Sequence, residues 1–126
     1  VFLNLLTSQK ESAIVNVSSI VAFMPSIRMA TYSASKAALH SYSQALRLSL
    51  SKTAVKVFEL MPPLVNTEFS KEIGGEKGIA PSLVAKALID AFEKDIYEIH
   101  VGNTADIYEL ARTSPVQALQ TMNPTL

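Results

Sequence analysis

Short apolar runs alternate along this chain with longer segments whose apolar residues recur at helical spacing. Residues 13–17 read Ala-Ile-Val-Asn-Val, a β-branched run between polar residues that favours a buried parallel strand. Similar runs at 55–60 and 97–101 predict two more strands. Pro62 and Pro63 end the first of these, because proline cannot donate to a sheet ladder.

Three segments have the periodicity of amphipathic helices. Residues 31–50 contain no Gly or Pro and predict the longest helix. A second helix is expected from residue 81 to about residue 92, and a third over 104–111. After that, Pro115 and Pro124 predict an irregular tail.

The segment from 65 to 81 is polar and carries Gly74, Gly75 and Gly78. Such a segment is either a flexible lid over a site or an ordinary solvated loop, and its composition favours neither. The resulting order is strand, helix, strand, loop, helix, strand, helix. This order predicts an α/β fold whose parallel strands are joined by right-handed crossovers.

Composition excludes several classes of function. The chain has 126 residues, of which 48% are hydrophobic, so we expect one domain with a packed core. Eleven basic and eleven acidic side chains cancel without clustering, which argues against a nucleic-acid partner. No apolar run reaches the ~18 residues of a membrane helix. A chain without cysteine has no disulfide or thiolate chemistry, and a cytoplasmic location is the default expectation.

Two side chains on the longest predicted helix have a spacing with a direct chemical use. Tyr32 and Lys36 are four positions apart, so both project from one face of the helix. A nearby ammonium favours the phenolate over a phenol that ordinarily titrates near ~10, which makes tyrosine a usable acid or base. The pair alone is a weak signal, since chance often produces it. His40 and His100 are too few and too separated for a metal site or a hydrolytic triad, so no metal site is predicted.

The surrounding residues make the signal stronger. Ile-Val-Asn-Val-Ser-Ser at 14–19 is followed, after twelve residues, by Tyr-Ser-Ala-Ser-Lys-Ala-Ala at 32–38. This arrangement resembles the catalytic core of the short-chain dehydrogenase/reductase family. The run from residue 12 onward is most similar to the reductases associated with D-alanine/lipoteichoic acid operons. The resemblance implies the C-terminal half of a Rossmann-type doubly wound parallel sheet, with about three parallel strands and flanking helices.

The resemblance also implies roles for individual residues. The family's catalytic serine lies thirteen residues before the tyrosine, which selects Ser19 rather than Ser18. Ser19 would bind the substrate oxygen, Tyr32 would transfer its proton, and Lys36 would also contact the nicotinamide ribose of NAD or NADP. The expected nicotinamide-binding residues are therefore Tyr32, Lys36, Pro62, Val65 and Thr67.

This sequence departs from the family pattern in three places. Pro63 replaces a glycine of the Pro-Gly landmark before Thr67, and Ala22 replaces a glycine that follows the serine. The glycine-rich turn that binds pyrophosphate is absent. We therefore expect residues 1–126 to be a partial domain that lacks the nucleotide-binding half. The missing half, or a second copy in a homo-oligomer, would then cover an exposed strand edge.

Three functions remain open on these residues. The intact parent would be an NAD(P)-dependent oxidoreductase that interconverts an alcohol and a carbonyl, while this chain alone would be inactive. The second possibility is a half-domain that binds protein or itself without catalysis. The third is an unrelated α/β binding module in which the trio is coincidental, and it predicts that Ser19 and Tyr32 lie far apart.

Overall fold

Three parallel strands form the centre of the molecule. The computed structural model describes residues 2–124. Its sheet has the order β1-β2-β3, built from β1 (Ser12–Val17), β2 (Val55–Met61) and β3 (Glu98–His100). Both strand pairs are parallel, as the order of elements predicted. The third strand is shorter than expected at both ends.

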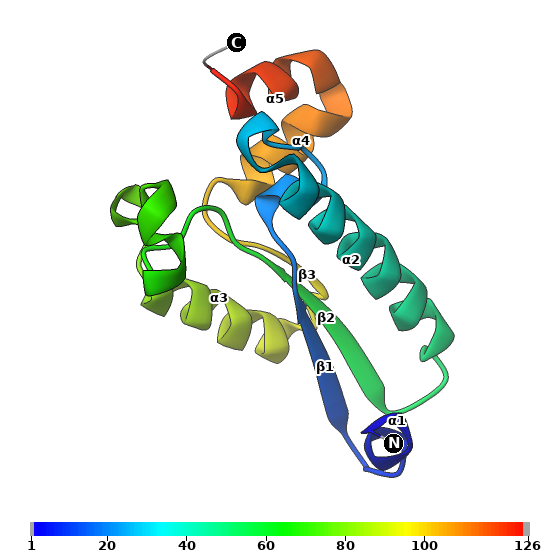
Figure 1. Cartoon of the computed structure of the whole chain (residues 1–126). Helices are drawn as coiled ribbons and strands as arrows, with labels where there is room; N and C mark the ends of the chain where they lie inside the picture. Colours follow the sequence, from blue (N-terminus) through cyan, green and yellow to red (C-terminus); the bar gives the residue numbers. More distant parts are fainter. Residues whose placement is uncertain (1, 125–126) are drawn as a thin grey trace.

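Helices cover both faces of this sheet (Figure 1). Helix α2 (Ala30–Ser49) lies along one face, and α3 (Pro81–Lys94) lies along the other. Helix α1 (Phe2–Thr7) lies beside the start of β1, while α4 (Thr104–Thr113) and α5 (Pro115–Met122) lie beyond the ends of the strands. The molecule is therefore an α/β layered structure, in agreement with the predicted class.

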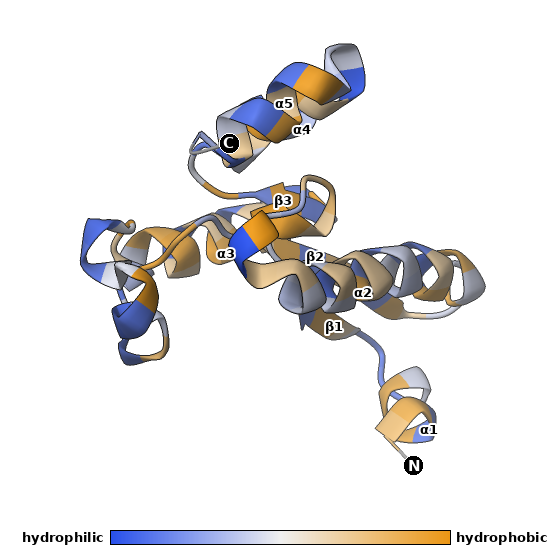
Figure 2. Ribbon diagram, turned by 45° about the horizontal axis from the view of Figure 1, so that its top comes forward, coloured by the Kyte–Doolittle hydropathy of each residue, from blue (hydrophilic) through white to orange (hydrophobic). Residues whose placement is uncertain are grey.

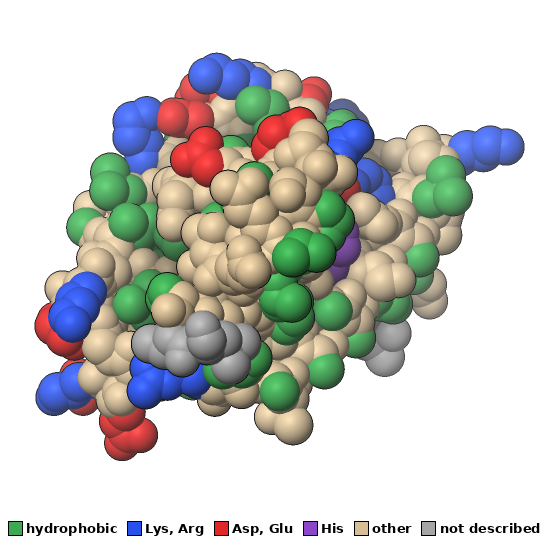
Figure 3. Space-filling view, turned by 90° about the horizontal axis from the view of Figure 1, so that it is seen from above, with side chains coloured by type: hydrophobic (Ala, Val, Ile, Leu, Met, Phe, Trp, Pro, Cys, Tyr) green, Lys and Arg blue, Asp and Glu red, His purple; other side chains and the backbone are tan. Residues whose placement is uncertain are grey.

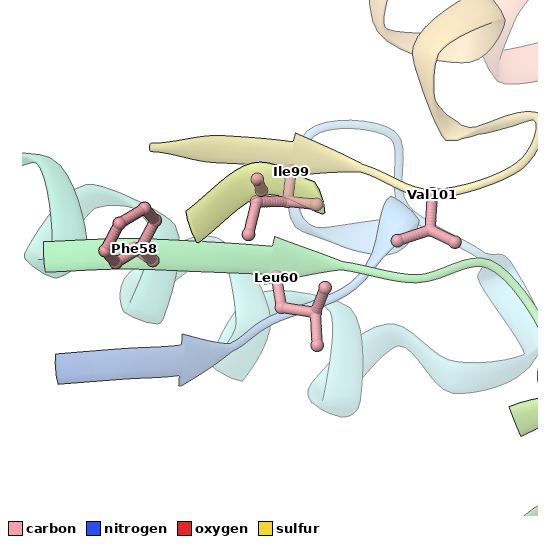
Figure 4. Packing of buried hydrophobic residues seen from close by; sticks show 5 residues of the cluster. Phe58, Leu60, Ile99 and Val101 are labelled. Atoms are coloured by element: carbon pink, nitrogen blue, oxygen red, sulfur yellow. The ribbon is translucent and has the colours of Figure 1, made fainter. Parts of the chain in front are cut away.

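The main apolar core lies between the sheet and α3. Figure 4 shows Phe58 and Leu60 of β2 beside Ile99 and Val101, which come from β3 and the residue that follows it. Ala91 of α3 completes this buried cluster. Alternate residues of a strand point to opposite faces, so each strand gives one set of side chains to this core and the other set to α2.

The predicted irregular tail is wrong, because residues 115–122 form α5. Pro115 occupies the first turn of that helix, where the missing N–H has no intrahelical partner to lose. Proline was interpreted as a break, whereas here it starts a helix. Asn123, just after α5, is buried and bonds to a loop near the start of the chain's longest helix.

The segment between β2 and α3 has more regular structure than its composition predicted. Two short 3-10 helices, η3 (Glu68–Ile73) and η4 (Gly75–Lys77), lie between Val65 and Ile79, which form an isolated parallel bridge. Gly78 makes this bridge possible, since a Cβ there would lie 2.7 Å from the Leu64 carbonyl oxygen. The structure does not decide between the two alternatives, a lid over a site and an ordinary solvated loop.

The start of β1 is the least covered part of the described structure. Strand β1 pairs with β2 along one edge only. The neighbouring helix α1 is largely hydrophobic in Figure 2, and the side chains of Phe2 and Leu5 are 80% and 59% exposed. None of the helices within residues 2–124 has the length and hydropathy needed to cross a membrane.

Candidate active site

The predicted serine lies where the chain leaves β1. Ser19 is the N-cap of a short 3-10 helix, η1 (Ile20–Ala22), and its hydroxyl oxygen accepts a bond from the Val21 amide at 3.4 Å. The next amide, that of Ile20, donates to the Pro62 carbonyl at 3.0 Å. This bond holds the serine segment against the exit of β2.

The two adjacent serines have different surroundings. The Ser18 hydroxyl donates to the carboxylate of Glu59, a residue with no exposed surface, and so is directed into the core. Within residues 2–124, the Ser19 hydroxyl accepts a hydrogen bond and donates none. Its hydroxyl proton is thus available to a ligand, whereas that of Ser18 is already used. The role of Ser19 as the catalytic serine stays a prediction.

Tyr32 and Lys36 lie on the first turns of α2, against the same segment. The Tyr32 ring packs against the cluster that contains Ile20 and Val21, the residues directly after Ser19. The Lys36 ammonium lies 5.4 Å from the centroid of the Tyr32 ring and donates to the Val17 carbonyl at 2.8 Å. The structure therefore brings the serine segment, the tyrosine and the lysine to one place, at the carboxyl end of β1.

Small polar side chains allow α2 to begin so close to this segment. Ser33 is buried, and its hydroxyl donates to the Met29 carbonyl at 2.9 Å while accepting from the Ser26 amide at 3.2 Å. On the other side of the loop, the Asn123 side chain accepts from the Ile27 amide at 2.9 Å. The loop that leads to Tyr32 is consequently attached both to α2 and to the C-terminal helix.

The remaining predicted residues lie around the exit of β2. Pro62 lies beside the serine segment through its carbonyl, and the Val65 amide takes no part in the bridge to Ile79. Thr67 caps η3 in a reciprocal capping box with Ser70, whose hydroxyl lies 3.2 Å from the Thr67 hydroxyl. The Thr67 hydroxyl can therefore donate to a ligand if it accepts the bond from Ser70. If it donates to Ser70 instead, that bond must be exchanged before a ligand can receive the proton.

Pro63, which replaces a glycine of the family pattern, packs beside Gly102. The Pro63 ring lies 3.4 Å from the position that a Cβ on Gly102 would occupy. Gly102 also has a φ of +58°, a conformation that favours glycine. Pro63 thus packs onto a residue without a side chain just after β3.

A cluster of three aromatic side chains borders the site on the side of α4. Phe23, His100 and Tyr108 pack with centroid separations between 4.4 and 6.2 Å. Burial lowers the pKa of His100, although the carboxylates of Glu98 and Glu59 oppose that shift. The His100 Nε2 atom and the buried Thr104 hydroxyl have no hydrogen-bond partner among residues 2–124.

Comparison with known proteins identifies the family. A family model described as short chain dehydrogenase matches residues 1–78, which include all six predicted catalytic and cofactor-binding positions. The chain belongs to this short-chain dehydrogenase family. The chain is 43% identical over 74 residues to the uncharacterised oxidoreductase DltE of Bacillus subtilis, covering 59% of this chain and 29% of the relative. This match agrees with the subfamily resemblance seen in the sequence.

Two further matches define how much of a short-chain dehydrogenase is represented. An uncharacterised oxidoreductase of Staphylococcus saprophyticus is 37% identical over 89 residues, covering 69% of this chain and 38% of the relative. A short-chain dehydrogenase of Burkholderia cenocepacia, solved in complex with NADP, superposes with a TM-score of 0.85 at 30% identity. That alignment covers 95% of this chain and 50% of the Burkholderia protein. The chain thus spans half or less of the relatives it matches.

Sequence reasoning missed one buried group beside this site. Glu59 lies in the middle of β2 with its carboxylate bonded to Ser18 and, at 2.8 Å, to His40. The signal was present, since a glutamate within the run Val-Lys-Val-Phe-Glu-Leu-Met is unusual for a central strand. His40 is accordingly a hydrogen-bonded structural histidine.

Proposed function

We propose that the intact protein carrying this chain is an NAD(P)-dependent reductase or dehydrogenase that interconverts an alcohol and a carbonyl. Ser19, Tyr32 and Lys36 are its catalytic residues. The observation that carries this proposal is the convergence of the Tyr32 ring and the Lys36 ammonium on the segment between Val17 and Val21. Family membership and the NADP-bound Burkholderia relative support the same chemistry.

The residues around the site fit the nicotinamide end of such a cofactor. The Lys36 ammonium, the Thr67 hydroxyl and the Val65 amide are hydrogen-bond donors at the carboxyl ends of parallel strands, where nucleotides bind in open α/β sheets. The Pro62 carbonyl accepts from the Ile20 amide and so keeps the exit of β2 beside the Ser19 segment. No glycine-rich turn for the pyrophosphate occurs in the 126 residues. The chain therefore supplies part of a cofactor site.

The chain's own residues account for the proton transfer. The bound nicotinamide supplies or accepts the hydride. In the reduction, the Ser19 hydroxyl donates a hydrogen bond to the carbonyl oxygen, and the Tyr32 hydroxyl transfers its proton to that oxygen. The Lys36 ammonium stabilises the resulting phenolate through its positive charge. Solvent then returns a proton to Tyr32, and the oxidation follows the reverse path.

The substitution Tyr32→Phe in the intact protein tests this proposal. Removing the hydroxyl should lower kcat for carbonyl reduction by roughly 10² to 10⁴, because general acid catalysis contributes that much. Cofactor affinity, measured by the fluorescence of the reduced nicotinamide, should change far less. Tyr42→Phe is the matched control, since it removes a phenol hydroxyl from the same helix almost three turns beyond Tyr32, away from the Ser19 segment. Unchanged turnover in Tyr32→Phe would exclude the proposed chemistry.

The free edge of β1 favours an assembled state of the protein. A cleft beside that edge is lined mainly by apolar side chains from α1, β1 and α2, namely Phe2, Leu3, Leu6, Ile14, Asn16, Tyr42 and Leu46. We propose that further strands of the domain, or a second copy of the chain, cover this cleft. Homo-oligomerisation and a cytoplasmic location stay predictions. Charges of both signs are interspersed on the face shown in Figure 3, without an extended basic area.

A non-catalytic half-domain is the alternative function, and the exposed β1 edge is the feature that favours it. Titration of the purified 126-residue chain with reduced nicotinamide cofactor separates the two. Micromolar binding argues that the residues retain a working nicotinamide site. Self-association without any cofactor binding would favour the half-domain.

A further inference from the structure

A row of polar residues crosses the sheet on the face covered by α2. Asn16 of β1 is paired in register with Glu59 of β2, and Glu59 is paired with Glu98 of β3. Residues paired in this way point to the same face of a sheet. Most helix-covered sheet faces are apolar, so three adjacent polar residues at this interface require partners.

Helix α2 supplies a partner for each member of the row. The Asn16 side chain donates to Ser43 at 2.9 Å, and His40 lies 2.8 Å from Glu59. Glu98 accepts from Arg47 at 3.1 Å and from Gln44 at 3.3 Å. With Lys36, these helix residues form one stripe that faces the sheet. The register of α2 along the strands is consequently set by directional bonds.

Glu59 is the member of the row that contacts both parts of the candidate site. Its side chain is completely buried, and each carboxylate oxygen accepts one bond, from Ser18 and from His40. Ser18 directly precedes Ser19, and His40 lies one helical turn beyond Lys36. A buried carboxylate is costly unless both oxygens have donors, so these bonds persist together.

The donor and acceptor roles of the polar residues around Glu59 can be assigned one after another. The Gln44 amide nitrogen lies 3.3 Å from His40 Nε2 and 3.3 Å from a Glu98 oxygen, so its two hydrogens serve both. His40 Nε2 is then an acceptor, which assigns the proton to Nδ1, facing Glu59. Both Ser18 and His40 therefore donate to Glu59. A neutral amide in place of the carboxylate keeps one acceptor oxygen, so only one of these two donors retains its bond. The amide NH2 group then faces either the His40 N–H, which it opposes, or the Ser18 hydroxyl, which must turn to accept.

We propose that Glu59 is a positioning residue for the reaction, which holds the Ser19 segment and the helix bearing Tyr32 and Lys36 in a common register. It acts through Ser18 on one side and through His40 on the other. The inference rests on the proposed function, since it assumes that these three side chains perform the chemistry. Displacements of about 1 Å at reacting groups lower rates by as much as roughly 100-fold, so a small shift is measurable.

The test compares Glu59→Gln, Ser18→Ala and the double variant in the intact protein, with kcat counted per cofactor-binding site. Each single variant should lower kcat by roughly 10- to 100-fold. The KM for the nicotinamide cofactor should change less than about threefold, because no group that contacts it is removed. The double variant should be no slower than the slower single variant, since both substitutions break the same connection.

Ser43→Ala is the matched control. Ser43 is as buried as Glu59 and bonds to the same polar row through Asn16, but within residues 2–124 it makes no hydrogen bond to Ser18 or His40. It should lower the melting temperature to a similar extent as Glu59→Gln while leaving kcat per folded site within about twofold. A purely structural role for Glu59 predicts the same behaviour for both variants.

Two results would overturn the inference. One is a Glu59→Gln enzyme with kcat within twofold of the parent, or with a loss that Ser43→Ala reproduces. The other is a double variant whose loss is the product of the two single losses. Tyr32→Phe, measured in parallel, separates this inference from the proposed function. An active Tyr32→Phe enzyme contradicts the function itself, whereas an inactive one with a fully active Glu59→Gln contradicts only the positioning role.

Discussion

The two faces of the sheet are built on different principles. The α3 face is packed from apolar and aromatic side chains, with the Phe58 ring 4.6 Å from Phe92 and 5.1 Å from Tyr97 between centroids. The α2 face is apolar toward the start of the strands, where Val55 and Val57 pack with Leu50, and again at the end of β2, where Met61 is completely buried. Between these two regions, polar pairs replace the apolar contacts.

The two faces contribute differently: one mainly stabilises the fold, and the other mainly fixes the position of a helix. Apolar burial stabilises in proportion to area and has no direction, so many arrangements of α3 give similar energy. Hydrogen bonds to buried polar groups contribute little net energy but are expensive to misplace. The α2 face therefore specifies where the helix lies, and it is the face that carries Tyr32 and Lys36.

The largest expected effect on stability lies on the α3 face. Phe58 is 1% exposed, so Phe58→Ala should lower the free energy of unfolding by about 3–5 kcal/mol through lost burial and a cavity. Urea denaturation of the intact protein measures this loss. Phe58→Leu is the control and should cost less than about 1.5 kcal/mol. If kcat per folded molecule also fell strongly in Phe58→Ala, the two faces would not be separable.

An intermediate effect is expected at the Asn16–Ser43 pair. Ser43→Ala should cost about 1 kcal/mol, because the half-buried Asn16 amide loses its acceptor. The double variant Asn16→Val, Ser43→Ala removes both partners and should recover to within about 1 kcal/mol of the parent. Chemical denaturation of all four forms gives the coupling energy. A coupling near zero would mean that the polar row does not act as a set of pairs.

The smallest effect is expected at Glu98, where the polar row reaches solvent. Burial tends to raise the pKa of Glu98, but bonds from Arg47 and Gln44 outweigh it and lower the pKa below 4.5. A depressed carboxyl pKa stabilises the folded state above the unfolded value of 4.5, and that contribution is lost as pH falls through the folded value.

Glu98→Gln should therefore cost a few tenths to about 1 kcal/mol at pH 7, and less as pH falls below 4.5. Parallel denaturation curves at pH 7 and pH 3.5 provide the measurement. A cost that is equal at both pH values would show that the Arg47 pair contributes nothing through charge. Glu68→Gln on η3 serves as a control, since its partner Lys71 is 72% exposed and its pair should contribute little.

The regular elements were largely predictable because their signals are local. Strand β1, strand β2 and helix α2 follow from β-branched runs and helical periodicity within a few residues of one another. Helix α5 was missed because Pro115 is compatible with either a break or a first helical turn. The two short helices after Thr67 were missed because apolar residues do not recur at helical spacing in this glycine-rich polar segment.

The sequence by itself determined the class of fold and the spacing of Ser19, Tyr32 and Lys36, since these depend on local order along the chain. Only the tertiary structure decided that Ser18 bonds to a glutamate 41 residues away and that Asn123 holds a loop 96 residues before it. Such contacts depend on how the layers pack, because each polar group bonds to whichever partner the packing brings within reach. The division of the sheet into an apolar face and a polar, site-bearing face belongs to this second kind of information.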